Sequence, residues 1–323
     1  MTQRKLQDIR IVVLGGGTGL STLLRGLKKL THHLTAIVTV TDDGGSSGTL
    51  RRELGVLPPG DIRNCLVALS EEENLMAQLF QYRFPSAGSL SGHSFGNLFI
   101  TAMSSLAGGF DQGITCASKV LAIRGQVLPV TLSAVTLRAR LRNGRLVKGE
   151  SNIGRITEPI SELIVWPSPP PAAPKVIEAI DAADAIILGP GSLYTSIIAN
   201  LLVEGIVPAL RKTAAPKIYV CNIMTQPGET TGYTLTDHLH ALETHGAGEL
   251  LDVVIVNDAR IPEKVARRYA EEGAIPVKID KRAVKGIRMV KTSLISPEGI
   301  ARHDPLKLAA VIKNILREEN IVP

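Results

Sequence analysis

Aromatic residues are scarce in this chain of 323 residues: Phe, Trp and Tyr make up 3% of it, whereas hydrophobic residues of all kinds make up 44%. The core therefore has to be built mainly from Val, Ile, Leu and Ala. This aliphatic composition suits strands that are buried on both faces, as the strands of a parallel sheet are. Few aromatic side chains are present to stack on the bases of a single-stranded nucleic acid.

Cysteine is rare as well. Cys65, Cys116 and Cys221 lie far apart in the sequence, without the paired spacing of a disulfide framework or a structural zinc site. No apolar run is long enough to span a membrane. The first residues lead directly into a predicted strand, without the apolar segment of a signal peptide. We therefore expect a cytoplasmic protein with no membrane span.

The formal net charge of +6 permits nucleic acid, an anionic membrane or a phosphorylated small molecule as a partner. Apart from a basic run at 278–291, the Lys and Arg residues are dispersed along the chain. Such runs are usually solvated surface. We therefore expect a phosphorylated metabolite as the ligand, and no nucleic-acid partner.

Short apolar runs alternate with amphipathic segments along most of the chain. Residues 9–17 predict a buried strand that ends in a glycine turn, 20–30 the helix after it, and 34–43 a second strand. This order is a βαβ unit with parallel strands. Further strand patterns occur near 183–189, 217–224, 250–258 and 274–280, and Asp304 with Pro305 begins a C-terminal helix.

The middle of the chain has a different pattern. Residues 59–123 are mainly helical in pattern, and 133–151 alternate polar and apolar residues around Asn143-Gly144, which is a strong hairpin signal. A proline-rich connector follows at 166–174. We predict a single α/β domain over 1–323: a doubly wound, mainly parallel, Rossmann-like sheet. An inserted helical and β-hairpin region, approximately 59–170, covers the carboxyl ends of the strands, where such sheets bind ligands.

The first candidate ligand-binding motif is the glycine turn after the first strand. Its residues are Gly15, Gly16, Gly17, Thr18 and Gly19. Glycines let the backbone approach a ligand closely, and the following helix directs free amides at an anion. Leu20 stands where the dinucleotide fingerprint has its third glycine, and no Walker lysine follows. We predict phosphate or nucleotide contact here rather than a plain strand-to-helix turn.

The second motif combines paired acids with a glycine-serine loop. Asp42 and Asp43 are expected at the end of the second strand, where they can hold Mg²⁺. The loop after them offers amides and hydroxyls to phosphate oxygens. At a predicted helix start, Asp61 is expected both to cap the helix and to join the site. The other members are Gly44, Gly45, Ser46, Ser47, Gly48, Arg51, Arg52, Arg63 and Asn64.

A third motif, "SGHSFGNLFI", places His93 and Asn97 four residues apart, on one helical face if the helix has begun. We predict that they touch the ligand. Three further histidines, His238, His240 and His245, are interpreted as residues of a solvent-exposed helix face rather than as zinc ligands.

The fourth motif repeats the first. A buried strand ends in a glycine turn, and a helix follows, so both turns are expected at the same sheet edge. The polar loop after the next strand and two late residues complete the predicted site. The residues are Gly189, Gly191, Ser192, Thr195 and Ser196 in the turn and helix, Asn222, Met224 and Thr225 in the loop, and Tyr269 and Arg302 later in the chain.

Several long strings, "VLGGGTGLSTLLRGLK", "TVTDDGGSSGTLRRELGVLPPGDIRNCLVALS", "GHSFGNLFI", "GPGSLYTSIIANLLVEGI" and "YVCNIMTQPGETTGYTLTDHL", resemble the YvcK-type gluconeogenesis factor family. That family belongs to the CofD-like superfamily, named for 2-phospho-L-lactate transferase of deazaflavin coenzyme synthesis. The resemblance runs from Arg10 to the C-terminal helix.

The resemblance implies two alternatives. The YvcK-type branch is associated with growth on gluconeogenic carbon sources, cell shape, wall synthesis and UDP-sugar binding. The transferase branch carries a metal-dependent reaction, which would use Asp42, Asp43, Arg63 and His93 here. The strings "DDGGSSG" and "MTQPGET" match the first branch, so we expect a nucleotide-sugar binding regulator, with a Mg-dependent transferase as the alternative. We also expect a homodimer, and cell-wall synthesis or regulatory proteins as partners.

Overall fold

Seven parallel strands form the central sheet of the computed structural model, which describes residues 5–71, 73–85, 88–280, 286–297 and 299–322. The predicted α/β, Rossmann-like class is confirmed. In spatial order the strands are β10 (Arg288–Thr292), β9 (Val253–Asn257), β8 (Lys217–Val220), β7 (Ala185–Leu188), β1 (Arg10–Gly15), β2 (His33–Val38) and β3 (Gln126–Pro129).

The strand order reverses at β1. The chain passes from β1 through β2 to β3 on one side, and then returns to place β7, β8, β9 and β10 on the other side. Strands β1 and β7 are neighbours, with Ile11 paired to Ala185 and Leu14 to Leu188. The carboxyl ends of β1 and β7 are therefore the topological switch point, where ligands of doubly wound sheets bind.

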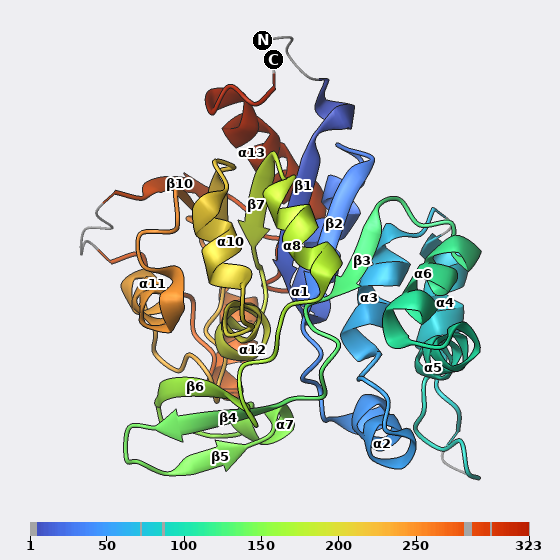
Figure 1. Ribbon diagram of the computed structural model, residues 1–323. Helices are drawn as coiled ribbons and strands as arrows, with labels where there is room; N and C mark the ends of the chain where they lie inside the picture. The colour runs from blue at the N-terminus through green and yellow to red at the C-terminus, as the bar shows by residue number, and fades with distance from the viewer. Residues whose placement is uncertain (1–4, 72, 86–87, 281–285, 298, 323) are drawn as a thin grey trace.

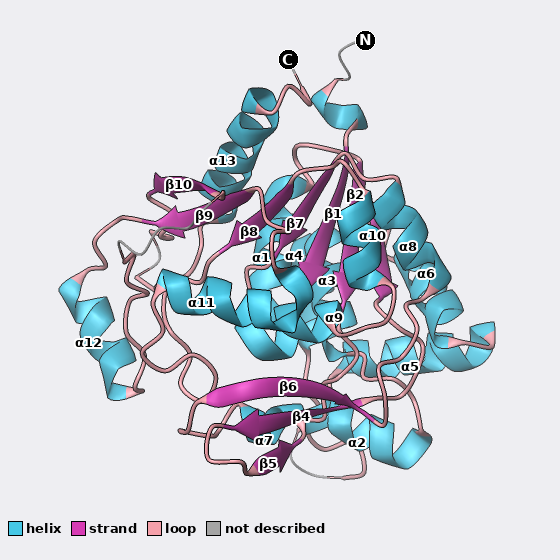
Figure 2. Cartoon of the chain, turned by 60° about the vertical axis from the view of Figure 1, so that its left-hand side comes forward, coloured by secondary structure: helices cyan, strands magenta, loops and turns pink. Residues whose placement is uncertain are grey.

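Helices cover both faces of this sheet (Figure 1 and Figure 2). Ile11 and Val13 of β1 face one apolar core, and Val12 and Leu14 face the other, because side chains alternate along a strand. The first core contains α1 (Gly17–Leu27), α3 (Gly60–Leu69) and α13 (Pro305–Glu318); the second contains α8 (Pro174–Asp181), α10 (Ile206–Lys212) and α11 (Leu235–Leu242). Asp304 caps α13 through the amides of Leu306 and Lys307, as expected.

The middle of the chain folds as its pattern predicts, with α4 (Glu73–Gln81), α5 (Phe95–Ala107) and α6 (Phe110–Val120) after α3. The predicted hairpin is formed by β4 (Thr136–Leu141) and β5 (Leu146–Lys148), and β6 (Ile160–Trp166) completes a small antiparallel sheet. This sheet lies with α7 (Glu150–Ile153) and α2 (Gly45–Leu54) at the carboxyl end of the main strands (Figure 2). The same stretch also supplies β3 to the main sheet.

Three local predictions are wrong. Strand β2 ends at Val38 rather than Asp43, because β1 turns into α1 after Gly15 and offers no further partner. The glycine-serine segment is the first turn of α2 rather than a loop. Residues 274–280 make only isolated bridges, since Pro276 lacks an amide hydrogen, and the last sheet strand is β10 instead.

The first turn of α2 depends on its small residues. A Cβ atom at Gly48 would lie 2.0 Å from the carbonyl oxygen of Asp43, and Ser46 and Ser47 are buried. Among the described residues, none of the helices has the length and hydrophobicity of a membrane span.

Candidate functional site

The two glycine turns lie against each other at the switch point. A Cβ atom at Gly19 would be 2.5 Å from the carbonyl oxygen of Pro190, and one at Gly191 would be 3.3 Å from that of Gly16. Gly17 has φ +63°, a conformation that favours glycine. The sequence of each turn is thus set by the close approach of the other.

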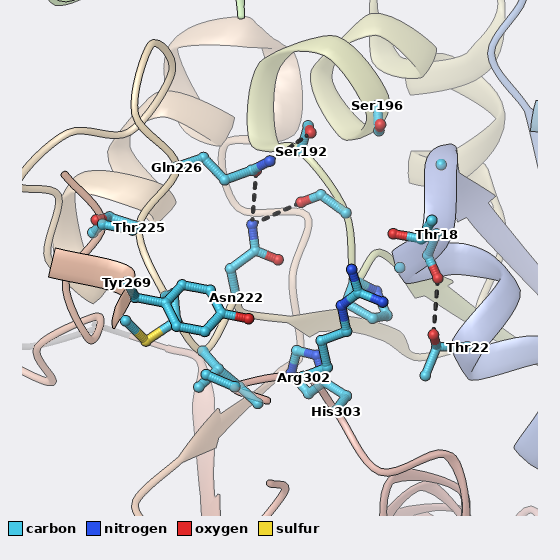
Figure 3. A pocket seen from close by; sticks show the side chains of 18 of the residues that line it. Thr18, Thr22, Ser192, Ser196, Asn222, Thr225, Gln226, Tyr269, Arg302 and His303 are labelled. Carbon is cyan, nitrogen blue, oxygen red and sulfur yellow. Dashed lines mark hydrogen bonds between the residues drawn. The ribbon is translucent and has the colours of Figure 1, made fainter. Parts of the chain in front are cut away.

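A pocket of about 340 Å³ opens beside these turns (Figure 3). It brings together most of the predicted residues of the first and fourth motifs with those from the later loops. The predicted residues that line it are Gly16, Gly17, Thr18, Gly19, Gly191, Ser192, Ser196, Asn222, Met224, Thr225, Tyr269 and Arg302. Gly15, Gly189 and Thr195 do not line it.

One wall of the pocket is the N-terminal turn of α1, an eleven-residue helix without a side-chain cap. Free amides and the positive end of the helix dipole favour an anion at such a position. The hydroxyl groups of Thr18 and Ser196 lie on this side of the pocket. This wall is suited to phosphate oxygens.

The opposite wall comes from the segments after β8 and β9. The amide group of Asn222 donates to the carbonyl of Gly191 at 2.9 Å and to Oε1 of Gln226 at 3.3 Å, and Gln226 donates to Oγ of Ser192 at 2.9 Å. Tyr269, on α12 (Glu263–Glu271), and Arg302, before α13, complete this wall (Figure 3). Among the described residues, the guanidinium group of Arg302 has no ion-pair partner.

His303 lies beside Arg302 in the same wall and is buried. Burial lowers the pKa of its imidazole to about 4, opposed by a hydrogen bond to the backbone of Cys221. Its Nε2 atom is buried and has no hydrogen-bond partner within the described ranges. The ring is therefore neutral near pH 7, and the positive charge of this wall belongs to Arg302.

Four polar side chains that line the pocket were not predicted, those of Thr22, Gln226, Glu272 and His303. Thr22 lies one helical turn after Thr18 and donates to its carbonyl, so helical spacing was a usable signal. Gln226 belongs to the polar loop that contains Asn222, and His303 adjoins Arg302. Glu272 had no signal in the sequence, because its place depends on the packing of α12.

Thr195 points away from the pocket, toward a buried carboxylate that sequence reasoning missed. The side chain of Glu229 accepts from the hydroxyl of Thr195 at 2.8 Å and from the amide of Tyr194 at 3.0 Å. Burial raises its pKa, and the hydrogen bonds from Thr195 and Tyr194 oppose this. Glu229 thus supplies buried hydrogen-bond acceptors to the helical segment that begins at Leu193, and fastens the 222–230 loop to it.

The residues of the second and third motifs form a separate polar cluster, where the N-terminal turns of α2, α3 and α5 meet. Oγ of Ser46 lies 3.1 Å from Nδ1 of His93 and 3.1 Å from Nδ2 of Asn97. The N-cap Ser94 accepts from Arg63 at 2.7 Å, and Arg63 also donates to Asn64. His93 and Asn97 converge as expected, although α5 begins only at Phe95. Neither side chain lines the pocket.

Asp42 and Asp43 face different partners. Oδ1 of Asp42 accepts from the amide of Gly44 at 2.9 Å, whereas Oδ1 of Asp43 accepts from the amide of Ser151 at 2.9 Å and so caps α7. The described ranges contain no group of three or more His, Cys, Asp or Glu side chains arranged to hold a metal ion. Each of the two acids thus has one oxygen bound to a backbone amide, and the magnesium site on the pair stays a prediction.

Asp61 links the cluster to the first glycine turn. It is not the cap of α3, because Pro59 occupies the N-cap position; its carboxylate instead accepts a hydrogen bond from the amide of Gly17. Burial raises the pKa of Asp61 to about 6, and the charge of nearby Asp42 raises it further, against Arg63, which lowers it. A carboxyl group that is half protonated near pH 6 thus lies directly behind the turn.

The histidine prediction on α11 is wrong for two of its three residues. His240 is exposed, but His238 and His245 are buried. Nε2 of His245 accepts from the amide of Leu163 in β6 at 2.9 Å, and burial lowers the pKa of the ring. His245 thereby ties the small sheet to the segment after α11. The basic run at 278–291 falls partly outside the described residues.

The chain is similar to several known proteins. A family model described as 2-phospho-L-lactate transferase CofD matches residues 11–295. A putative gluconeogenesis factor of Nostoc sp. is 54% identical over 96% of this chain and 69% of its own length. The gluconeogenesis factor of Bacillus subtilis is 46% identical over 97% of this chain and 99% of its own length. A crystal structure of a UPF0052-family protein from Bacillus halodurans matches with a TM-score of 0.91 and 45% identity, over 96% of this chain and 99% of that one.

Proposed function

The chain belongs to the CofD family, among relatives named gluconeogenesis factors, and from this premise we propose that it is a nucleotide-sugar binding regulatory protein. Its ligands are UDP-sugars, and it is required for growth and cell morphogenesis on gluconeogenic carbon sources. It acts in the cytoplasm as a homodimer of single-domain subunits and reports nucleotide-sugar supply to proteins of cell-wall synthesis.

One observation carries the proposal: the two glycine turns meet at the switch point, and the unpaired Arg302 lines the same pocket. A diphosphate is the ligand group that uses all three features. The helix α1 N-terminus attracts one phosphate, the turn at Gly191 leaves room for backbone approach, and a guanidinium group suits phosphate geometry. His303 is neutral at physiological pH, so Arg302 supplies the positive side-chain charge for this anion.

The remaining pocket wall supports a nucleoside next to the diphosphate. Tyr269 offers an aromatic face and Met224 an adaptable apolar side chain, and both line the pocket. Asn222 is held in place by Gly191 and Gln226, so its amide is a fixed group for reading a base or a sugar. A few oriented polar groups on an otherwise preformed wall are typical of small-molecule sites.

The test is calorimetric titration with UDP-N-acetylglucosamine, GDP and NADP, each with and without Mg²⁺. We expect UDP-N-acetylglucosamine to bind in the micromolar range without being consumed. Arg302→Ala should weaken that binding about tenfold or more, because it removes a charged hydrogen-bonding group. Arg260→Ala is the matched control, since Arg260 is exposed and outside the pocket. The proposal fails if the wild-type protein does not bind UDP-sugars.

The alternative function is a Mg-dependent transferase of a phosphorylated group. It is favoured by the printed description of the matching family model and by the polar cluster beside the first turn, where Arg63 interacts electrostatically with Asp61 and Asp42. In this alternative, Arg63 and His93 would hold the transferred phosphate. Metal-dependent consumption of a nucleotide that is lost in Asp42→Asn would establish it; binding without consumption supports the regulator.

Cellular and assembly measurements address the rest of the proposal. A strain that lacks the gene should grow and keep its shape on glucose but not on a gluconeogenic carbon source, and Arg302→Ala should fail to restore growth. Light scattering of the purified protein should give the mass of two chains. A monomer at micromolar concentration would contradict the homodimer.

A further inference from the structure

Glu272 is the one carboxylate among the described residues that line the pocket. It directly follows α12, its side chain is exposed, and its amide donates to the carbonyl of Tyr269. Within the described ranges its carboxylate has neither a hydrogen bond nor an ion pair. The pocket therefore presents a free anionic group on the wall that carries Tyr269.

The position of this acid is not explained by the stability of its helix. A carboxylate at a helix C-terminus meets the negative end of the helix dipole, which is unfavourable. Arg302 lines the same pocket, yet the two side chains form no ion pair. The pocket thus has an unpaired cation and an unpaired anion on its walls, an arrangement that suits a ligand with an anionic part and a hydrogen-donating part.

In doubly wound folds, an acid near the end of the second strand usually receives the hydroxyl groups of the ribose. Here that position is held by Asp42 and Asp43, and neither lines the pocket. Both have partners of their own, the amides of Gly44 and Ser151. A nucleotide bound at the two glycine turns would therefore find no ribose acid on the β2 side of the sheet.

We propose that Glu272 accepts hydrogen bonds from the ribose hydroxyl groups of the bound nucleoside diphosphate; this rests on the nucleotide-sugar function proposed above. The two oxygen atoms of the carboxylate match a vicinal diol. Arg302 takes the diphosphate, so the two residues together fix the direction of the ligand across the pocket. The charge of Glu272 also repels a further phosphate on the same ribose, which selects against 2′-phosphorylated nucleotides.

The test is a cycle that removes the two partners of this contact separately. Wild-type protein, Glu272→Ala and Glu272→Gln are titrated with UDP, 2′-deoxy-UDP and 3′-deoxy-UDP by calorimetry, and with UDP-N-acetylglucosamine for comparison. Glu271→Ala is the matched control, because Glu271 is also an exposed acid at the end of α12 but lies outside the pocket. UDP is used without its sugar, so that a contact with the sugar cannot imitate a contact with the ribose.

Wild-type protein should bind UDP about tenfold more tightly than at least one of the deoxy analogues. Glu272→Ala should lose about tenfold for UDP and discriminate little between UDP and that analogue, whereas Glu271→Ala should behave as wild type. Glu272→Gln keeps an acceptor oxygen and should fall between them. Equal losses for UDP and both analogues in Glu272→Ala, or a loss seen with UDP-N-acetylglucosamine but not with UDP, would overturn this proposal alone. Absence of UDP and UDP-N-acetylglucosamine binding to the wild-type protein would overturn both proposals.

Discussion

Asp61 should make the protein less stable at neutral pH than at mildly acidic pH, and Asp61→Asn should remove this dependence. The carboxylate lies behind the first glycine turn and accepts from the amide of Gly17, but burial raises its pKa from 3.8 to about 6. A raised folded-state pKa means that the protonated group is favoured in the folded protein. The contribution to stability is then complete below pH 3.8 and is lost as the pH rises through about 6.

The size of the effect follows from the shift of about two pKa units, at about 1.4 kcal/mol each. This gives an upper value of about 3 kcal/mol, and partial exposure of Asp61 to water reduces it to about 2 kcal/mol. The oxygen of an asparagine side chain still accepts from the amide of Gly17, so the substitution removes the charge and keeps the contact. We therefore expect Asp61→Asn to unfold at higher urea concentration than wild type at pH 8.

The measurement is urea unfolding followed by circular dichroism at pH 8, 6.5 and 5. The gain of about 2 kcal/mol at pH 8 should be almost unchanged at pH 6.5 and about half as large at pH 5, because the effect disappears fully only below the unfolded-state pKa of 3.8. Asp258→Asn is the control, because Asp258 is exposed and its side chain has no described partner. A difference between Asp61→Asn and wild type that stays constant over this range, or a variant that is less stable at every pH, would refute the reasoning.

Three further predictions concern other contacts. Gly19→Ala should lose UDP-sugar binding in calorimetry and lower the free energy of unfolding by about 1–3 kcal/mol, because its methyl group would lie 2.5 Å from the carbonyl oxygen of Pro190. Unchanged binding would argue against the contact between the turns. Glu229→Ala should cost about 3 kcal/mol in urea unfolding, since it leaves the buried hydroxyl of Thr195 and an amide unpaired, and a cost near zero would contradict the capping role. Burial lowers the pKa of His245, so its contribution to stability is complete above the unfolded-state pKa of 6.5 and is lost as the pH falls through the lower folded-state pKa. The pH dependence of the free energy of unfolding should therefore be weaker in His245→Ala than in wild type. An unaltered pH dependence would exclude this role of His245.

The parts of the site that follow a strong local pattern could be predicted from the sequence. Each glycine turn follows a run of buried aliphatic residues, so the sequence predicts both where the strand ends and where the next helix begins. Parallel pairing then requires the two turns to lie at the same edge of the sheet. This is why the sequence predicts one site for residues as distant as Gly16 and Gly191, which are in close contact in the structure.

The parts that depend on tertiary contacts could not be predicted. Glycine and serine have low helix propensity, so the sequence predicts a loop where α2 begins. Its helix is held by buried contacts, such as that of Ser46 with His93 and Asn97. The sequence predicts that Asp61 both caps α3 and joins the site; the cap is wrong, because the hydrogen-bond partner of Asp61 is Gly17, which is distant in sequence. Glu229 is a cap supplied from another segment, which no local pattern reveals.

The close fit of Gly19 against Pro190 means that neither half of the fold carries a usable half of the pocket. Two segments separated by some 170 residues must pack together to form the pocket, so the capacity to hold a small molecule belongs to the chain as a whole. A fragment that stops after β3 would lack Gly191, Asn222 and Arg302, and therefore this pocket, however well its own strands pair.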